Sequence, residues 1–481
     1  MSQNANRMYE TTYNRAAATV GVVHIGFGNF HRAHQAVYFD DFMQKTGDLG
    51  WGIAAVNLRP DDTPLFNRVA TGTGYALKIT SPQGDVAVRL VRSHLEFHDW
   101  VTAPDAAEAL LARPGVKLVT ATVTESGYYL DEQGALDTAH TVIAAEMQNG
   151  PSTSVYAYLA NGLARRMAVG GGPITILCCD NMRSNGKTLQ RNLDTYLRAS
   201  DRSTLADWLR ANASFPCSMV DRITPRPAAD LAAEISALTG RETLAPINSE
   251  SYIQWVIEDR FAGLRPDLAR VGAELVAHVD PYEEAKIRIL NGGHSALAYL
   301  GGLAGHKTFD QAMQDPALRP HFDAWERENV LPALPADLPF DKAAYLAKVV
   351  ERFCNAVIAD TLERICMDGC AKFRLFIVPT LADCLSQGVV PTHGYTTIAS
   401  WFLFSRRFAS GELDIEYQEP GWHMLEPLLA PGRERDFAKC TSLWGNLPAE
   451  FPGFVPGVLA AIEAMEAQHK RQGPIDRIAV A

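Results

Sequence analysis

The sequence predicts an α/β protein with two parts: a doubly wound, mostly parallel sheet domain, followed by a mainly α-helical domain. Two observations lead to this fold class. Apolar strand-like runs alternate with helix-like segments through the first half of the chain, which is typical of a parallel sheet with helices on its faces. After Asp280, helical periodicity continues and strand patterns become scarce.

Length and charge limit what this chain can be. A chain of 481 residues is too long for one core, so we predict two domains, 1–280 and 281–481. The net charge of −11 argues against a nucleic-acid partner. No apolar run is long enough to span a bilayer, and residues 1–20 lack the apolar core of a signal peptide. We therefore expect a cytoplasmic protein that binds neither nucleic acid nor membrane.

The first domain is predicted to alternate between strands and helices. A buried strand over 22–25 leads into a helix over 30–43, and a second strand follows over 51–56. The runs 75–80 and 86–91 flank Ser-Pro-Gln-Gly-Asp, which predicts a hairpin. Further strands are predicted over 116–123, 174–179, 252–257 and 273–279, and further helices over 153–167 and 187–198. We expect the last two strands to extend the same sheet.

The second domain is predicted to be built from helices that Pro and Gly separate. These helices are expected over 342–352, 381–387, 395–407 and 458–469. With the boundary at about residue 280, a helix that begins there would lie at the seam between the domains. A cleft at such a seam is a usual place for a ligand.

A glycine-rich turn follows the first predicted strand. In Ile-Gly-Phe-Gly-Asn-Phe-His-Arg (25–32), Gly26 provides a tight turn and Gly28 lets the backbone approach a pyrophosphate at a helix N-terminus. His31 replaces the third glycine of the usual pattern, which predicts looser packing of helix on strand. Arg32 would add positive charge near the phosphates. The alternative is a turn without a ligand, but its position after the first buried strand favours a Rossmann-like dinucleotide site.

The end of the second predicted strand bears on the choice of cofactor. An acid at this point commonly binds the adenosine ribose. Asp61 or Asp62 would therefore favour NAD, whereas Arg59 would favour the 2′-phosphate of NADP, and a solvated loop is the third alternative. The candidate cofactor-binding residues are Gly26, Phe27, Gly28, Phe30, Arg32 and Asp61.

A helix is predicted to begin at Asp280. Asp280 is suited to the N-cap, Pro281 to the first helical position and Glu283 to the acid of a capping box. At about 100° per residue, Glu283, Lys286, Asn291 and His294 fall within one arc of this helix. A solvated polar face is the simpler interpretation, but polar groups on a helix that must also pack suggest a site.

Together with a nicotinamide cofactor, these residues predict oxidation of an alcohol. No zinc-ligand pattern is present and the eight cysteines are scattered, so a side chain must act as the base and no metal is expected. Lys286 is the candidate base. Asn291 and Asn181 would donate hydrogen bonds to the reacting oxygen, and His294 would bind a substrate hydroxyl. For Asn181 the alternative role is capping the helix that follows it.

The motifs around these residues resemble those of a known family, the polyol-specific long-chain dehydrogenases, or mannitol dehydrogenase family. The resemblance extends from about Val22 to Gly457. It rests on the runs 26–35, 122–129, 179–181, 219–225, 286–294 and 364–372. It implies that Lys286 is the general base, that Asn181 and Asn291 form an oxyanion hole, and that His294 binds substrate. It also places Asp221 in the active site and Arg364 and Lys372 in contact with the polyol.

Within this family the chain is most similar to members that oxidise D-arabinitol to D-xylulose, and the run 57–62 resembles an NAD-using form. Gly292 and Gly293 depart from the small polar residues common there, which implies a reshaped substrate pocket. Oxidation of D-mannitol to D-fructose and reduction of a hexuronate stay open as alternatives. So do the use of NADP and, outside enzymes, a role as an NAD-binding sensor. The resemblance favours a monomer.

Overall fold

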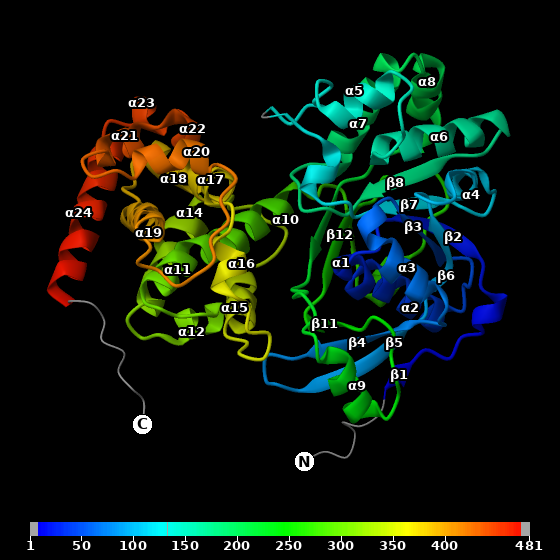
Figure 1. The fold of residues 1–481 in the computed structure, drawn as a ribbon, viewed down its shortest axis with the longest axis horizontal. Helices are drawn as coiled ribbons and strands as arrows, with labels where there is room; N and C mark the ends of the chain where they lie inside the picture. The colour runs from blue at the N-terminus through cyan, green and yellow to red at the C-terminus, as the bar shows by residue number, and fades with distance from the viewer. Residues whose placement is uncertain (1–7, 132, 473–481) are drawn as a thin grey trace. The chain divides into compact units, whose positions relative to one another are not determined.

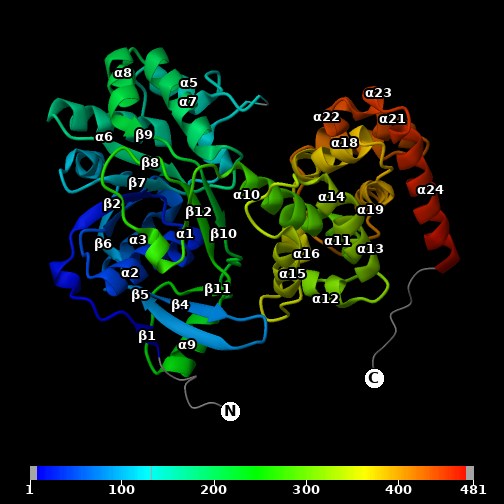
Figure 2. The ribbon, with the colours of Figure 1, turned by 180° about the vertical axis from the view of Figure 1, so that it is seen from behind.

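The computed structural model describes residues 8–131 and 133–472 (Figures 1 and 2). The chain divides between Asp280 and Pro281 into two compact units, and the second unit also includes Pro82–Gly84. We call them the N-terminal unit and the C-terminal unit and describe each by itself.

The N-terminal unit is built on a six-stranded sheet in which every neighbouring pair is parallel. Its strand order is β6-β3-β2-β7-β8-β9, so the chain first builds outward from β2 on one side and then on the other. This reversal beside β2 is the switch point of a Rossmann-type fold. The strands are β2 (Val20–Ile25), β3 (Gly52–Asn57), β6 (His94–Asp99), β7 (Leu118–Ala121), β8 (Ile174–Cys178) and β9 (Ala213–Ser214). The predicted doubly wound domain is confirmed.

Helices cover both faces of this sheet (Figure 1). Alternate strand residues face opposite cores: Val23 and Ile25 pack with α6 and α7, whereas Val22 packs with α2 and α3. This explains why the strands are apolar on both faces. The helices of the unit are α1 (Asn29–Ala33), α2 (Gln35–Thr46), α3 (Thr63–Ala70), α4 (Pro104–Ala109), α5 (Thr141–Met147), α6 (Val155–Ala168), α7 (Asn185–Ala199), α8 (Ser203–Asn212) and α9 (Leu231–Thr239).

Two details of the first domain differ from the prediction. The single helix predicted over 30–43 is interrupted at His34, whose φ of −118° and ψ of −90° are not helical. The late strands β12 (Gln254–Glu258) and β13 (Glu274–Val276) do not extend the main sheet but form a separate sheet with β10 (Ser218–Asp221). The reason is packing: Trp255 and Ile257 of β12 bury their side chains in the core beside α2.

The predicted hairpin is present and forms the middle of a third sheet. β4 (Tyr75–Thr80) and β5 (Val86–Val91) pair antiparallel over their full lengths. β1 (Tyr9–Glu10) and β11 (Ile247–Glu250) flank the hairpin on its two sides.

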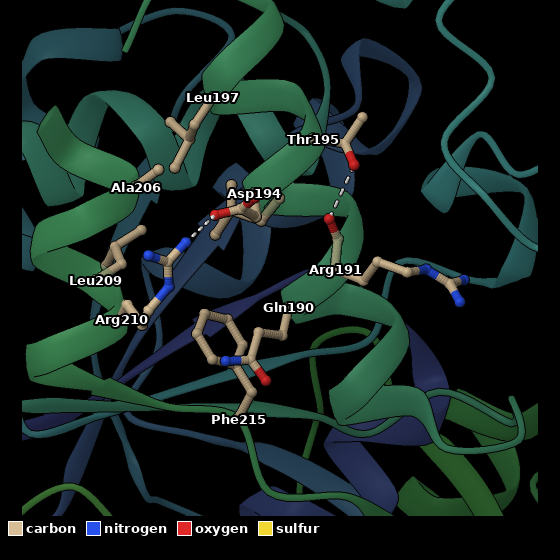
Figure 3. A pocket seen from close by; sticks show the side chains of 10 residues that line it. Gln190, Arg191, Asp194, Thr195, Leu197, Ala206, Leu209, Arg210 and Phe215 are labelled. Carbon is tan, nitrogen blue, oxygen red and sulfur yellow. Dashed lines mark hydrogen bonds and ion pairs between the residues drawn. The ribbon is translucent and has the colours of Figure 1, made fainter. Parts of the chain in front are cut away.

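Helices α7 and α8 enclose a surface cavity of about 290 Å³ (Figure 3). Phe215 and Leu209 provide its apolar wall, and an ion pair between Arg210 and Asp194 crosses its rim. None of the predicted site residues lines this cavity.

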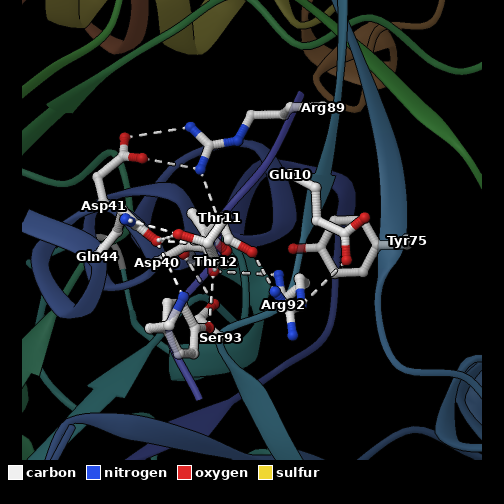
Figure 4. A network of polar contacts seen from close by, with 12 residues as sticks. Glu10, Thr11, Thr12, Asp40, Asp41, Gln44, Tyr75, Arg89, Arg92 and Ser93 are labelled. Carbon is white, nitrogen blue, oxygen red and sulfur yellow. Dashed lines mark hydrogen bonds and ion pairs between the residues drawn. The ribbon is translucent and has the colours of Figure 1, made fainter. Parts of the chain in front are cut away.

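Buried charges join α2 to the hairpin (Figure 4). Arg89 of β5 donates to Asp40 at 2.8 Å and to Asp41 at 2.9 Å. Asp40 also accepts a hydrogen bond from the Thr11 hydroxyl at 3.3 Å. Because both partners are present, the buried carboxylate of Asp40 is compensated, and the contacts fix α2 relative to the hairpin.

The C-terminal unit is helical, as predicted, around one large apolar core. The four predicted helices correspond to α15 (Lys342–Phe353), α18 (Val378–Ser386), α19 (Thr392–Ala409) and α24 (Phe454–Gln472). The other helices are α10 (Asp280–Ala285), α11 (Gly292–Leu303), α12 (Phe309–Gln314), α13 (Arg319–Ala324), α14 (Leu331–Ala333), α16 (Leu362–Cys366), α17 (Gly369–Lys372), α20 (Trp422–Leu425), α21 (Glu434–Lys439), α22 (Thr441–Trp444) and α23 (Leu447–Glu450). Trp325, Trp401 and Trp444 are fully buried in the core. No helix of the described chain is long and apolar enough to cross a membrane.

Within the described part of this unit, three segments are π-helical. They are η6 (Lys286–Asn291), η7 (Trp325–Val330) and η8 (Phe373–Ile377). Short π segments inside α-helices occur frequently at functional sites. Here one of them includes Lys286 and Asn291, and another begins directly after Lys372.

Candidate active site

The turn after β2 requires a glycine at position 26. Gly26 has φ +94°, and a Cβ there would lie 2.2 Å from the carbonyl oxygen of Thr122. The Gly26 amide donates to the Val56 carbonyl, and the Thr122 amide donates to the Ile25 carbonyl, both at 2.9 Å. The turn is therefore pressed between the carboxyl ends of β3 and β7, at the switch point of the sheet.

Gly28 leaves space for a ligand in this turn. It is the N-cap of α1, and an added Cβ would meet no atom within 4 Å. Open space beside backbone N–H groups at a helix start suits an anionic group. The turn therefore fits the pyrophosphate of a dinucleotide.

Other residues of the turn point into the protein. Phe27 is buried and makes edge contacts with Phe66 and Phe97. The guanidinium of Arg32 is also buried, lies 4.3 Å from the centre of the Tyr75 ring and donates to the Ala245 carbonyl. Burial lowers the pKa of Arg32 to about 10, so it stays charged at neutral pH. Arg32 thus packs the turn from inside, and its contact with the phosphates stays a prediction.

One further turn residue, Phe30, and the ribose candidates at residues 59–62 complete the predicted cofactor-binding set. Phe30 stacks on His34 with ring centres 4.9 Å apart. Asp61 is exposed in the short 3-10 helix Pro60–Asp62, which follows β3. The ion pair at this point joins Arg59 to Asp62 at 3.7 Å.

Asn181 lies directly beyond the carboxyl end of β8 and is exposed. It is not the N-cap of the next helix, because α7 begins at Asn185 with Ser184 as its N-cap. The Asn185 side chain donates to the carbonyl of Asp180 at 3.0 Å and to that of Ser218 at 2.8 Å. These bonds fix the backbone beside Asn181, and the capping alternative is excluded.

Asp221 ends β10 and is buried. The neighbouring Arg222 is buried as well, and it donates to the carbonyls of Glu250 and Ala33. Burial lowers the pKa of Arg222 to about 10. Its guanidinium links the strand end that carries Asp221 to the end of α1.

In the C-terminal unit, Lys286, Asn291 and His294 lie on one continuous but irregular helix. The prediction of regular spacing at about 100° per residue is wrong from Lys286 to Asn291, because this segment is π-helical and a wider turn takes more residues. Lys286 is 8% exposed, whereas Asn291 and His294 are partly exposed. All three still belong to the same polar stretch of an otherwise apolar helix.

Positive charges surround His294. Its ring packs against Phe353, with ring centres 4.2 Å apart. Burial, and then the charges of Arg364, Lys372 and Arg352, lower the pKa of His294 well below its ordinary value. His294 is therefore neutral at physiological pH and can either donate or accept a hydrogen bond.

The two predicted substrate-binding cations are held by groups of the same region. Arg364 pairs with Asp360, with Nε donating to Oδ1 at 2.6 Å. Lys372 donates to the Ile365 carbonyl at 2.8 Å, and burial followed by the charge of Arg364 lowers its pKa. The structure thus brings Arg364 and Lys372 near His294, whereas their contact with a polyol stays a prediction.

Three buried residues of these regions were not predicted from the sequence. Arg352 is a buried cation of α15 near His294, and its only sequence signal is a charge next to the apolar residue Phe353. Glu326 of η7 is fully buried beside Gly293, and neither carboxyl oxygen has a hydrogen-bond partner among the described residues. The Asp180 carboxylate is buried before Asn181 and accepts three hydrogen bonds from the loop after β7 and one from the Cys178 thiol.

Comparisons with known proteins match both units. Residues 20–270 match the family model of the mannitol dehydrogenase Rossmann domain, and residues 278–464 match that of the mannitol dehydrogenase C-terminal domain. The chain is 39% identical to D-arabinitol 4-dehydrogenase of Klebsiella pneumoniae, over 92% of this chain and 97% of the relative. It is 36% identical to mannitol 2-dehydrogenase of Cereibacter sphaeroides, over 94% and 95%. The solved ternary complex of Pseudomonas fluorescens mannitol 2-dehydrogenase with NAD and D-mannitol has a TM-score of 0.85 at 30% identity, covering 96% of this chain and 95% of that chain.

Proposed function

Because this chain belongs to the mannitol dehydrogenase family and is a polyol dehydrogenase, we propose that it oxidises D-arabinitol to D-xylulose with NAD, reversibly and without a metal. The substrate follows from the similarity to D-arabinitol 4-dehydrogenase along nearly the whole chain. The observation that carries the chemistry is a buried lysine on a π-helical segment that also contains an asparagine and is followed by a neutral histidine.

The cofactor is assigned to the N-terminal unit. NAD, when bound, accepts the hydride from the alcohol carbon. Gly26 and Gly28 shape the turn for the pyrophosphate, and Asp61 is the proposed partner of the adenosine ribose. Support for NAD comes from the open space at Gly28, the exposure of Asp61 and the NAD complex of the related mannitol 2-dehydrogenase.

The proposed proton transfer uses the C-terminal unit. Lys286 takes the proton from the reacting hydroxyl while the hydride leaves the same carbon. Asn291 and Asn181 donate hydrogen bonds to the oxygen as it becomes a carbonyl. His294 binds a neighbouring hydroxyl, and Asp221, Arg364 and Lys372 complete the contacts to the polyol.

Two other substrates are alternatives of this proposal. D-Mannitol is supported by the relatives that are mannitol 2-dehydrogenases. A hexuronate is supported by the cations Arg364, Lys372 and Arg352 around His294, since guanidinium and ammonium groups bind carboxylates. A sensor without activity is excluded, because this chain is a polyol dehydrogenase of the mannitol dehydrogenase family.

A substrate panel tests the proposal. Purified protein is assayed with D-arabinitol, D-mannitol, D-xylulose, D-fructose and a hexuronate, each with NAD(H) and NADP(H), by absorbance of the reduced cofactor. We expect the highest kcat/KM for D-arabinitol with NAD. A higher kcat/KM for D-mannitol or the hexuronate would make that compound the substrate in place of D-arabinitol. A preference for NADP would make NADP the cofactor in place of NAD. No turnover of any of these compounds would refute the proposal.

A further inference from the structure

Asp180 connects the loop after β7 to the end of β8. Its carboxylate accepts the backbone amides of Val123 at 3.0 Å and Thr124 at 2.9 Å, and the Tyr128 hydroxyl at 2.7 Å. All three donors belong to residues 122–129, which we call the β7 loop. One buried side chain therefore determines where the β7 loop lies.

The β7 loop needs such a restraint because its backbone is strained. Thr124 has φ +66° and ψ +161°, a region that is essentially limited to glycine. Tyr129 is also left-handed, with φ +49° and ψ +50°. A β-branched residue such as Thr124 keeps this conformation only when its surroundings impose it, and the bond to Asp180 does so.

The β7 loop borders the place where this fold binds dinucleotides. It starts at Thr122, whose carbonyl contacts the turn at Gly26, and β7 is the neighbour of β2 across the switch point. β8 is the next strand of the sheet (Figure 1). The same Asp180 that holds the loop immediately precedes Asn181, a proposed oxyanion donor.

We propose that Asp180 is a positioning residue: by accepting the Val123, Thr124 and Tyr128 hydrogen bonds, it fixes the β7 loop and Asn181 in the geometry that hydride transfer requires. In this proposal Asp180 acts through the β7 loop and Asn181. The proposal rests on the function proposed for Asn181, so its test includes one measurement that does not depend on activity.

The protonation of Asp180 makes this arrangement dependent on pH. Burial raises the pKa of Asp180 to about 6, despite the hydrogen bonds from Tyr128, Val123 and Thr124, and Glu125 adds to this shift. The other titratable groups that face it are Tyr128, Cys178 and Cys179, whose pKa values lie above their ordinary ranges, so they stay neutral. The ionised carboxylate accepts these hydrogen bonds, whereas the protonated acid carries a hydrogen of its own that faces the same donors and weakens them. The restraint on the loop therefore weakens as the pH falls through about 6.

The first experiment measures reduction of D-xylulose by NADH with the wild type, Asp180→Asn, Thr124→Gly and the double variant. We expect Asp180→Asn to lower kcat by about 10–100-fold, as for displaced catalytic groups, with little change in KM for NADH. Thr124→Gly removes the strain, so the double variant should recover part of the lost kcat. Glu146→Gln is the matched control, because Glu146 is also buried and accepts the amides of Thr153 and Ser154; its kcat should stay at the wild-type level.

The pH profile of the same reaction separates positioning from loss of stability. Wild-type kcat should fall as pH decreases through about 6, because Asp180 becomes protonated. The Asp180→Asn profile should lack this inflection, and the Glu146→Gln profile should retain it. If Asp180→Asn keeps the wild-type kcat and inflection, Asp180 does not position the site.

Hydrogen exchange of the NADH complex tests the restraint without turnover. In Asp180→Asn, the peptide that contains the β7 loop should exchange at least about tenfold faster, since lost protection reports local opening, while the β8 peptide should be unchanged. Unaltered exchange in the β7 loop would overturn the inference. If the wild type reduces none of the ketoses in the panel but the loop is loosened as expected, the restraint by Asp180 stands and the proposed function fails.

Discussion

The two units hold their candidate groups in different ways. In the N-terminal unit, these groups lie on loops at strand ends, where backbone conformation is fixed by a glycine at Gly26 and by hydrogen bonds to Asp180 and Arg222. In the C-terminal unit, Lys286, Asn291 and His294 lie on one helix whose other face is buried in an apolar core. The positions of the candidate groups are therefore fixed by backbone contacts in the sheet unit and by side-chain packing in the helical unit. Substitutions in the two units should therefore have separable effects.

The largest effect is expected in the helical unit. Lys286→Ala should lower kcat by about 10²–10⁴-fold, because the base that removes the hydroxyl proton is gone. The affinity for NADH, measured by fluorescence titration, should be unchanged. Lys348→Ala, which removes an exposed lysine of the same unit, is the control and should be fully active. Turnover by Lys286→Ala within tenfold of the wild type would assign the base to another residue.

A second, smaller effect is expected for the hydrogen bonds that each unit donates to the reacting oxygen. Asn181→Ala and Asn291→Ala should each lower kcat by about 10²–10³-fold, the size expected for one oxyanion donor. Asn212→Ala removes an amide of the N-terminal unit whose side chain donates only to Trp208 at 2.9 Å, and it should be silent. If Asn181→Ala has a normal kcat while Asn291→Ala does not, the sheet unit contributes only to cofactor binding. The two units would then differ in function as well as in how they hold their residues.

A smaller effect is expected at the end of β3, where only cofactor choice should change. Asp61→Ala should lower the ratio of kcat/KM for NAD to that for NADP by about tenfold, the size of one hydrogen bond to a charged group. Asp207→Ala, which removes an exposed acid of α8 in the same unit, serves as the control and should leave the ratio unchanged. An unchanged ratio in Asp61→Ala would mean that another residue contacts the ribose.

The smallest effect concerns stability in the helical unit. Burial raises the pKa of Glu326 well above its ordinary value, so the folded protein holds a proton there that the unfolded chain releases above about pH 4.3. The wild type therefore loses stability as pH rises, and Glu326→Gln does not. The variant should have a higher Tm than the wild type at pH 8, by about 2–4 °C for each kcal/mol gained, and a smaller advantage at pH 5. Glu328→Gln, on an exposed position of the same π segment, should show no such trend.

Most of the fold could be predicted from the sequence because apolar runs and their alternation are local signals. The hairpin of β4 and β5 follows from its turn residues, and the parallel strands follow from their continuous burial. Pairing of β12 with β10 could not be predicted, because it depends on where the Trp255 side chain packs. The interruption of the helix at His34 has no turn residue to announce it.

The candidate site could be predicted only in part. Lys286, Asn291 and His294 stood out as polar residues on an apolar helix, and the resemblance supplied their roles. The π-helical segment was missed because no residue between Lys286 and Asn291 disfavours a regular α-helix. The burial of Arg32 against Tyr75 was missed, since a charge next to a glycine-rich turn gives no sign of it. Asp180 was missed because its partners lie far from it in the sequence, in the β7 loop.

Gly293 restricts how the substrate range of this protein can be redesigned. A Cβ at this position would lie 2.7 Å from a carboxyl oxygen of Glu326 and 3.0 Å from the Phe322 ring. A larger residue at position 293 would therefore first have to displace the Glu326 carboxyl group and the Phe322 ring. A library that varies residue 293 should for this reason vary residue 326 with it.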